Sequence, residues 1–119
     1  MKKARILAID DNLEFLELLE SFLTDESCDI LVTSKEEECL EYLKSKTFDI
    51  LLIDLNMPGV STVHIIKQAR KLQKGINVVI ASGSFYMDPE QQISSLADHF
   101  LDKAFGPDQL IAVIRRYCP

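Results

Sequence analysis

Residues 49–59 read Asp-Ile-Leu-Leu-Ile-Asp-Leu-Asn-Met-Pro-Gly. The apolar residues at 50–53 show no polar alternation, which is typical of a central parallel β-strand covered on both faces. Asp54 follows this run directly, and Met57-Pro58-Gly59 then breaks the chain. The segment therefore predicts a buried strand over residues 49–53 that ends at an acidic side chain.

Similar strand-like runs occur on both sides of this segment, at residues 5–9, 29–33, 77–81 and 99–101. Helical patterns alternate with them, at residues 12–23, from 34 onward, and at 62–72, 88–96 and 107–117. Helical crossovers between successive strands imply a parallel sheet. The expected fold class is therefore α/β, a five-stranded parallel sheet with helices on both faces. The run at 29–33 is the most polar and is expected at an edge.

Two of these helices carry signals that a structure can check. In the first helix, Phe15, Leu16, Leu19, Phe22 and Leu23 share one face at 100° per residue, while Leu13 points away. In the second, Ser34 followed by Glu37 has the spacing of a capping box. The second helix is expected to bury Cys39, Leu40 and Leu43.

Length and composition limit the function classes. The chain has 119 residues and a mass of 13.5 kDa, which predicts one domain over residues 1–119. Its net charge of −6 argues against nucleic acid as a direct partner and favours Mg²⁺ or a basic protein surface. No uncharged run approaches the ~20 residues of a membrane span. The apolar run at the start is short and is followed at once by Asp10 and Asp11, which argues against a signal peptide. The three cysteines lack metal-ligand spacing, which favours reduced thiols and a cytoplasmic location.

Polar side chains stand where the predicted strands end: Asp10 and Asp11 after the first, Asp54 after the third, Ser82 after the fourth and Lys103 after the fifth. The carboxyl ends of parallel strands meet at one edge of the sheet, where ligands bind. Neighbouring carboxylates repel one another unless a cation joins them, and Mg²⁺ suits such oxygen ligands. A lysine and a hydroxyl beside them suit a phosphoryl group, and an aspartate can act as the nucleophile.

Each residue also has an ordinary explanation. The acidic pair can serve the start of the first helix, with Asp11 or Asn12 as its cap. Asp54 and Ser82 can be turn residues, and Lys103 can be a solvated charge. The joint arrangement favours a site, because the ordinary explanations must be invoked separately at each of four strand ends.

Four motifs occur in order along nearly the whole chain: Ile-Asp-Asp at 9–11, Ile-Asp-Leu-Asn-Met-Pro-Gly at 53–59, Ile-Ala-Ser-Gly at 80–83 and Phe-Leu-Asp-Lys at 100–103. Together they resemble the CheY-like receiver domains of two-component response regulators. The resemblance implies a flavodoxin-like (βα)5 receiver fold. It also implies that Asp54 accepts the phosphoryl group, that Asp11 binds Mg²⁺ with Asp10 assisting, and that the backbone carbonyl of Asn56 is a further ligand.

The resemblance assigns the remaining residues to a switch. Lys103 would contact the phosphoryl oxygens, and Ser82 would be the hydroxyl drawn toward the phosphate. Phe100 would be the switch aromatic that moves as Ser82 moves, although a plain core role suits it as well. A phosphoryl group that binds one of two conformations better would then shift the population.

The implied partners are proteins. A histidine kinase or a phosphotransfer protein would supply the phosphoryl group, docking near the first helix. Leu13 is a candidate contact there, although a single exposed leucine needs no special explanation. The output surface would span roughly residues 89–117 and would act on a downstream protein target or output domain. No output region is expected within residues 1–119, so the chain is either a stand-alone regulator or a receiver excised from a longer protein.

Two other functions suit these residues less well. An aspartyl phosphatase of the haloacid-dehalogenase type needs Asp-x-Asp after its first strand and a longer chain, and a flavodoxin-like nucleotide carrier needs a less acidic first loop. A receiver-like interaction module that does not use phosphate, or an intermediate phosphorelay carrier, stays open. No enzymatic turnover is expected beyond self-catalysed phosphorylation and dephosphorylation.

Two departures from the family pattern affect the loops beside the predicted site. Ala104 follows Lys103 where proline with a cis peptide is usual, and we expect a trans bond because a cis bond before a non-proline costs roughly 2.5–4 kcal/mol. Val60-Ser61-Thr62 replaces the common Met-Asp-Gly, and Ser61 or Thr62 could cap the helix that follows. Neither hydroxyl is assigned any chemistry.

Overall fold

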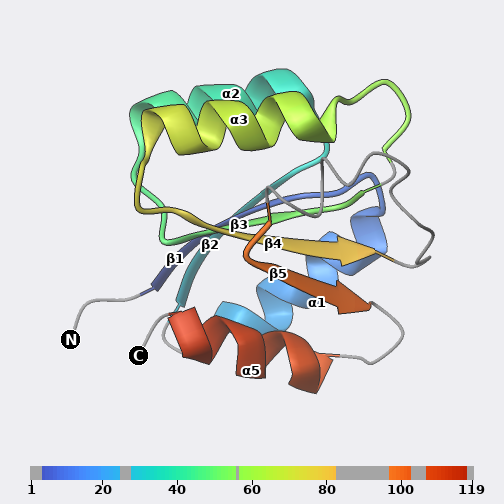
Figure 1. The fold of residues 1–119 in the computed structure, drawn as a ribbon. Coiled ribbons are helices and arrows are strands. Elements are labelled where there is room, and N and C mark those ends of the chain that lie inside the picture. The colour runs from blue at the N-terminus through green and yellow to red at the C-terminus, as the bar shows by residue number, and fades with distance from the viewer. Residues whose placement is uncertain (1–3, 25–27, 56, 83–96, 103–106, 118–119) are drawn as a thin grey trace.

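The computed structural model describes residues 4–24, 28–55, 57–82, 97–102 and 107–117 (Figure 1). Five strands lie in one sheet in the order β2-β1-β3-β4-β5. Their bounds are β1 Ala4–Ile9, β2 Cys28–Thr33, β3 Ile50–Ile53, β4 Asn77–Ser82 and β5 His99–Asp102. All four strand pairs are parallel, which confirms the predicted sheet, with β3 at its centre and β2 at an edge.

Helices cover both faces of this sheet, as predicted. Figure 1 shows α2 (Glu36–Ser45) and α3 (Thr62–Leu72) side by side on one face, and α1 (Leu13–Thr24) and α5 (Pro107–Tyr117) on the other. The helix expected at 88–96 lies outside the described residues. In the part of the chain that the structure describes, no helix has both the length and the apolar character needed to cross a bilayer.

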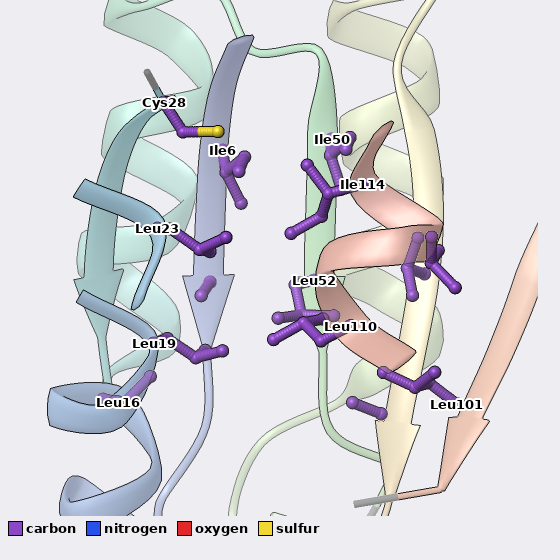
Figure 2. Close-up of a cluster of buried hydrophobic side chains, with 14 residues drawn as sticks. Ile6, Leu16, Leu19, Leu23, Cys28, Ile50, Leu52, Leu101, Leu110 and Ile114 are labelled. Carbon is purple, nitrogen blue, oxygen red and sulfur yellow. The ribbon is translucent and has the colours of Figure 1, made fainter. Parts of the chain in front are cut away.

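Alternation along the strands divides the interior into two hydrophobic cores. In β1, Ile6 and Ala8 face α1 and α5, whereas Leu7 and Ile9 face α2 and α3. The same alternation continues through β3 and β4, because successive side chains of a strand point to opposite faces. Figure 2 shows the α1–α5 core, in which side chains from the helices meet those from the strands. The continuous apolar runs in the sequence thus reflect burial on both sides.

The predicted buried face of α1 was too wide. Leu16, Leu19 and Leu23 are buried and Phe15 is partly buried, but Phe22 is 38% exposed. Phe22 lies roughly a quarter turn from the centre of the buried stripe, so it reaches the rim of the core rather than its interior. The prediction that Leu13 lies off the stripe is confirmed, since Leu13 is 63% exposed.

The predicted capping box at Ser34 was wrong. The cap position of α2 is Lys35, which makes no side-chain cap bond. Instead, the hydroxyl of Thr33 accepts a hydrogen bond from the backbone N–H of Lys35 at 3.1 Å. The helix begins too late for Ser34 to reach its first turn, and Glu36, Glu37 and Glu38 favour that end through the helix dipole.

The predicted cap of α3 is confirmed at Ser61. Its hydroxyl accepts a hydrogen bond from the backbone N–H of His64 at 3.2 Å. Of the residues expected in the α2 core, Cys39 and Leu43 are buried and Leu40 is partly buried.

Candidate functional site

Asp10, Asp11 and Asp54 meet at the carboxyl edge of the sheet. Each offers a carboxylate oxygen, and these oxygens lie within 4.8 Å of one another. The register explains this proximity, because Ile9 pairs with Ile53 and the next residue of each strand is an aspartate. Asp10 and Asp54 are only 2% and 6% exposed, whereas Asp11 is exposed. The predicted convergence of the three carboxylates is therefore confirmed.

Backbone hydrogen bonds hold the two buried aspartates in place. The N–H of Asp10 donates to the carbonyl of Thr33 at 3.1 Å, and the N–H of Asp54 donates to the carbonyl of Ile9 at 3.3 Å. Both bonds continue the parallel ladder by one residue beyond the strands. The two aspartates are thus fixed by the sheet rather than by a loose loop.

Asp10 and Asn12 make different hydrogen bonds at the start of α1. A carboxylate oxygen of Asp10 accepts from the N–H of Asn12 at 2.9 Å, and the side-chain oxygen of Asn12 accepts from the N–H of Phe15 at 3.1 Å. Asn12 therefore caps the helix. Asp10 therefore serves the start of α1, as its ordinary explanation predicts, and it also belongs to the carboxylate cluster.

The loop after Asp54 folds back on itself. The N–H of Val60 donates to the carbonyl of Met57 at 3.0 Å, closing a turn in which Gly59 has a φ of 77°. Residues with a Cβ atom rarely adopt this left-handed conformation, so glycine suits the position. The hydroxyl of Thr62, at the start of α3, donates to the carbonyl of Asp54 at 3.0 Å.

The structure describes only some of the other predicted site residues. Ser82 ends β4, where it pairs with Asp102 of β5, and its side chain lies outside the described part of the chain. Asn56, Lys103 and the Lys103–Ala104 peptide also lie outside it, so the predictions for them stay predictions. Phe100 lies on β5 with 37% of its surface exposed, which shows that the plain core interpretation was wrong.

The cluster fits a hard divalent cation. Its donors are all carboxylate oxygens, two from buried residues and one from an exposed residue, which gives a charged site open to solvent on one side. Mg²⁺ prefers such oxygen ligands and usually keeps several waters. A cation there would also offset the mutual repulsion of the carboxylates.

One contact at this site, the bond from Thr62 to the Asp54 carbonyl, is not predicted from the sequence. Thr62 is 5% exposed, and its hydroxyl is also 3.5 Å from the carbonyl of Leu55. A threonine at a helix start resembles an ordinary cap in the sequence, and only the folded loop brings it onto the Asp54 backbone.

The family model of the response regulator receiver domain matches residues 6–115. The chain belongs to this family. The receiver is 29% identical over 117 residues to the cell cycle transcriptional regulator CtrA of Caulobacter vibrioides, a match that covers 94% of this chain and 51% of CtrA. The chain thus spans about half the length of this relative.

Solved structures agree with the fold and with this family. The receiver superimposes on the response regulator TrrA of Thermotoga maritima in complex with Mg²⁺ and BeF with a TM-score of 0.84 and 27% identity, covering 96% of this chain and 98% of that one. It also superimposes on a chain in the structure of the histidine kinase ThkA in complex with TrrA. The TM-score is 0.83 and the identity 27%, and the match covers 98% of this chain and 99% of that chain. The predicted family and flavodoxin-like receiver fold are confirmed.

Proposed function

We propose that this receiver accepts a phosphoryl group on Asp54 with the help of Mg²⁺ and acts as a signalling switch. The observation that carries the proposal is the convergence of three carboxylates within 4.8 Å at the carboxyl edge of the sheet. Asp10, Asp11 and Asp54 would hold the ion, together with the backbone carbonyl of Asn56. When bound, Mg²⁺ would neutralise charge on the carboxylates and on the phosphoryl oxygens.

The chemistry proposed for Asp54 is nucleophilic. A carboxylate oxygen of Asp54 attacks the phosphorus atom of a phosphohistidine, and the bond from phosphorus to the histidine nitrogen breaks with its electron pair going to nitrogen. The product is an aspartyl phosphate. Lys103 and Ser82 would contact its oxygens, and Phe100 would move with Ser82. Because the product stays on the protein, we class the receiver as a switch and not as an enzyme.

The proposed phosphoryl donor is a histidine kinase or a phosphotransfer protein. The similarity to TrrA, which was solved in complex with the histidine kinase ThkA, supports this class of partner. Leu13 supports a docking site beside the carboxylates, because it is an exposed leucine two residues after Asp11. If it is a kinase contact, L13A will slow phosphotransfer from the kinase and leave uptake from acetyl phosphate unchanged.

The response to phosphorylation is proposed as a population shift. The phosphoryl group would favour one of two conformations and change the surface that includes β5 and α5. A downstream protein target, or an output domain on the same polypeptide, would recognise that surface. The rival is a receiver-like module that works through protein contacts without phosphate, or a relay carrier that passes phosphate onward.

Intact mass after incubation with acetyl phosphate tests the proposal. The wild-type chain should gain one phosphoryl group with Mg²⁺ and none when the metal is chelated. D54N should gain nothing, because an amide is a poor nucleophile. D29N is the matched control, since Asp29 lies at the opposite end of the sheet, on β2, and it should behave as wild type.

The outcomes separate the rivals. Phosphorylation of D54N to the same extent as wild type would contradict the assignment of Asp54. If neither acetyl phosphate nor a panel of phosphorylated kinases labels the wild-type chain, the interaction module without phosphate becomes the better explanation.

A further inference from the structure

The hydroxyl of Thr62 is a buried polar group that the proposed phosphoryl chemistry does not use. It donates to the carbonyl of Asp54 at 3.0 Å and lies 3.5 Å from the carbonyl of Leu55. Thr62 is the first residue of α3, eight positions after Asp54. The bond therefore ties the start of a helix to the backbone of the proposed phosphoacceptor.

The rest of this loop is tied down independently. Glu36, on α2, accepts a hydrogen bond from the N–H of Ser61 at 2.8 Å, so the loop ends against the neighbouring helix. A turn bond from the N–H of Val60 to the carbonyl of Met57 shortens the middle. Thr62 is the described contact that closes the loop back onto its first residues.

The position of this contact gives it a consequence for the site. Asp54 is held on one side by the bond from its N–H to Ile9 and on the other by the bond from Thr62 to its carbonyl. The two bonds fix the peptide units before and after the Cα atom, and hence the direction in which the carboxylate projects. A displacement of a reacting group by about 1 Å can slow a reaction by about 100-fold.

We infer that Thr62 is a positioning residue, whose hydroxyl orients the Asp54 carboxylate for metal binding and phosphoryl transfer by holding the Asp54–Leu55 backbone. This inference rests on the proposed function of Asp54. A purely structural role is the alternative, because a buried hydroxyl can simply stabilise a helix start. The two roles differ in whether metal affinity changes when the fold is intact.

Three variants separate them. T62V keeps the shape and removes the donor, T62S keeps the donor, and S61A removes the neighbouring cap hydroxyl, which bonds to the N–H of His64 and not to the Asp54 backbone. For each, Mg²⁺ alone is titrated and followed by amide chemical shifts. The rate of phosphoryl uptake from acetyl phosphate is then measured at saturating Mg²⁺, and thermal unfolding is recorded.

The expected result is a loss of Mg²⁺ affinity of about tenfold in T62V, the lower end of the effect of removing an outer-shell partner of a metal ligand. T62S should recover most of it, and S61A should unfold at a lower temperature with unchanged Mg²⁺ affinity. If T62V fails to fold, T62A serves as the second variant without the hydroxyl.

Wild-type affinity and uptake rate in a folded T62V or T62A variant would overturn the inference. So would a folded T62S variant that is as impaired as T62V, because the hydroxyl would then not be the cause. A wild-type chain that binds no Mg²⁺ and takes up no phosphate would instead contradict the proposed function of Asp54. The two failures are thus distinguishable.

Discussion

At the residue scale, the main feature is a group of like charges kept together by the sheet. The carboxylates of Asp10, Asp11 and Asp54 lie within 4.8 Å of one another, and the strand register and backbone hydrogen bonds hold Asp10 and Asp54 in place. Their repulsion opposes folding when no cation is present. Such a cluster gives up some stability in exchange for a binding site, a pattern common at functional sites.

Removing one of these charges should therefore change stability in opposite directions with and without metal. D11N should unfold at a higher temperature than wild type in EDTA, because one repulsive charge is lost. It should gain less stability from added Mg²⁺ than wild type does. Without the Asp11 carboxylate the folded state binds Mg²⁺ more weakly, and weaker binding stabilises the folded state less. Thermal unfolding with and without Mg²⁺, at matched ionic strength, measures both effects. Equal stabilisation by Mg²⁺ in both proteins would remove Asp11 from the metal site.

Cys39 is a second residue whose charge state is set by its surroundings. Burial, and to a lesser degree the charge of Glu36, raises the pKa of its thiol from 9.0 to about 12. The folded state thus keeps a proton that the unfolded chain releases. Stability from this group is fully present below pH 9 and is lost as the pH rises toward 12.

The corresponding prediction compares wild type with C39A in urea unfolding at pH 8, 9 and 10. The free energy of unfolding of wild type should fall more steeply above pH 9, with an excess slope that approaches about 1.4 kcal/mol per pH unit by pH 10. Other groups titrate in this range, but they are common to both proteins and cancel in the difference. Parallel pH profiles would show that the Cys39 thiol does not contribute.

At the scale of elements, one glutamine joins two helices to the central strand. The side-chain amide of Gln73 donates to the carbonyls of Leu43 at 2.9 Å and Lys46 at 2.7 Å, and its oxygen accepts from the N–H of Phe48 at 2.7 Å. Gln73 is also the C-cap residue of α3. It therefore connects the ends of α2 and α3 with the segment that leads into β3.

Q73M should destabilise the fold by about 2–3 kcal/mol, since three hydrogen bonds of roughly 1 kcal/mol each are lost with little change in volume. Urea unfolding measures this difference. Q109M provides the matched control, because Gln109 is an exposed glutamine on α5 and its replacement should change stability little. If Q73M is as stable as Q109M, the amide contributes nothing beyond its packing.

At the scale of the whole molecule, the sheet separates two cores that share only the backbone of the strands. Ile6 belongs to the core under α1 and α5, and Ile65 to the core under α2 and α3. Both side chains are fully buried. An ion pair between Arg70 and Asp98 at 2.9 Å further joins α3 to the segment before β5, but both groups are about a third exposed, so its contribution is small.

The two-core arrangement predicts additive losses within one cooperative transition. I6V and I65V should each lower the free energy of unfolding by about 0.5–1.5 kcal/mol. The double variant should lose the sum to within about 0.5 kcal/mol, because the two side chains share no partners. Urea unfolding followed by circular dichroism and tyrosine fluorescence measures this. Two separate transitions would show that the cores unfold independently.

Much of this molecule could be predicted from local sequence patterns. Continuous apolar runs indicated strands buried on both faces, and the order of elements indicated a parallel sheet. The convergence of Asp10, Asp11 and Asp54 followed from their positions after strands of such a sheet. The site roles predicted for Asn56, Ser82 and Lys103 remain predictions.

The errors and the missed contact share a physical cause. Phe22 was placed in the core because periodicity shows which face of a helix is apolar but not how wide a stripe the sheet covers. The cap predicted at Ser34 was wrong because α2 begins at Glu36. At that helix start the Thr33 hydroxyl accepts from the N–H of Lys35, and the Glu36 carboxylate accepts from the N–H of Ser61. In the same way, the bond from Thr62 to Asp54 joins residues that only the folded loop brings together.

Residue type and short periods along the chain are enough to predict the strand and helix pattern, the two-sided burial of the sheet and the carboxylates at its edge. They are not enough to predict which hydroxyl holds the Asp54 backbone, how far α1 is covered and where α2 starts. Those features depend on hydrogen bonds and contacts between segments whose relative placement is set by packing, and no local pattern encodes that placement.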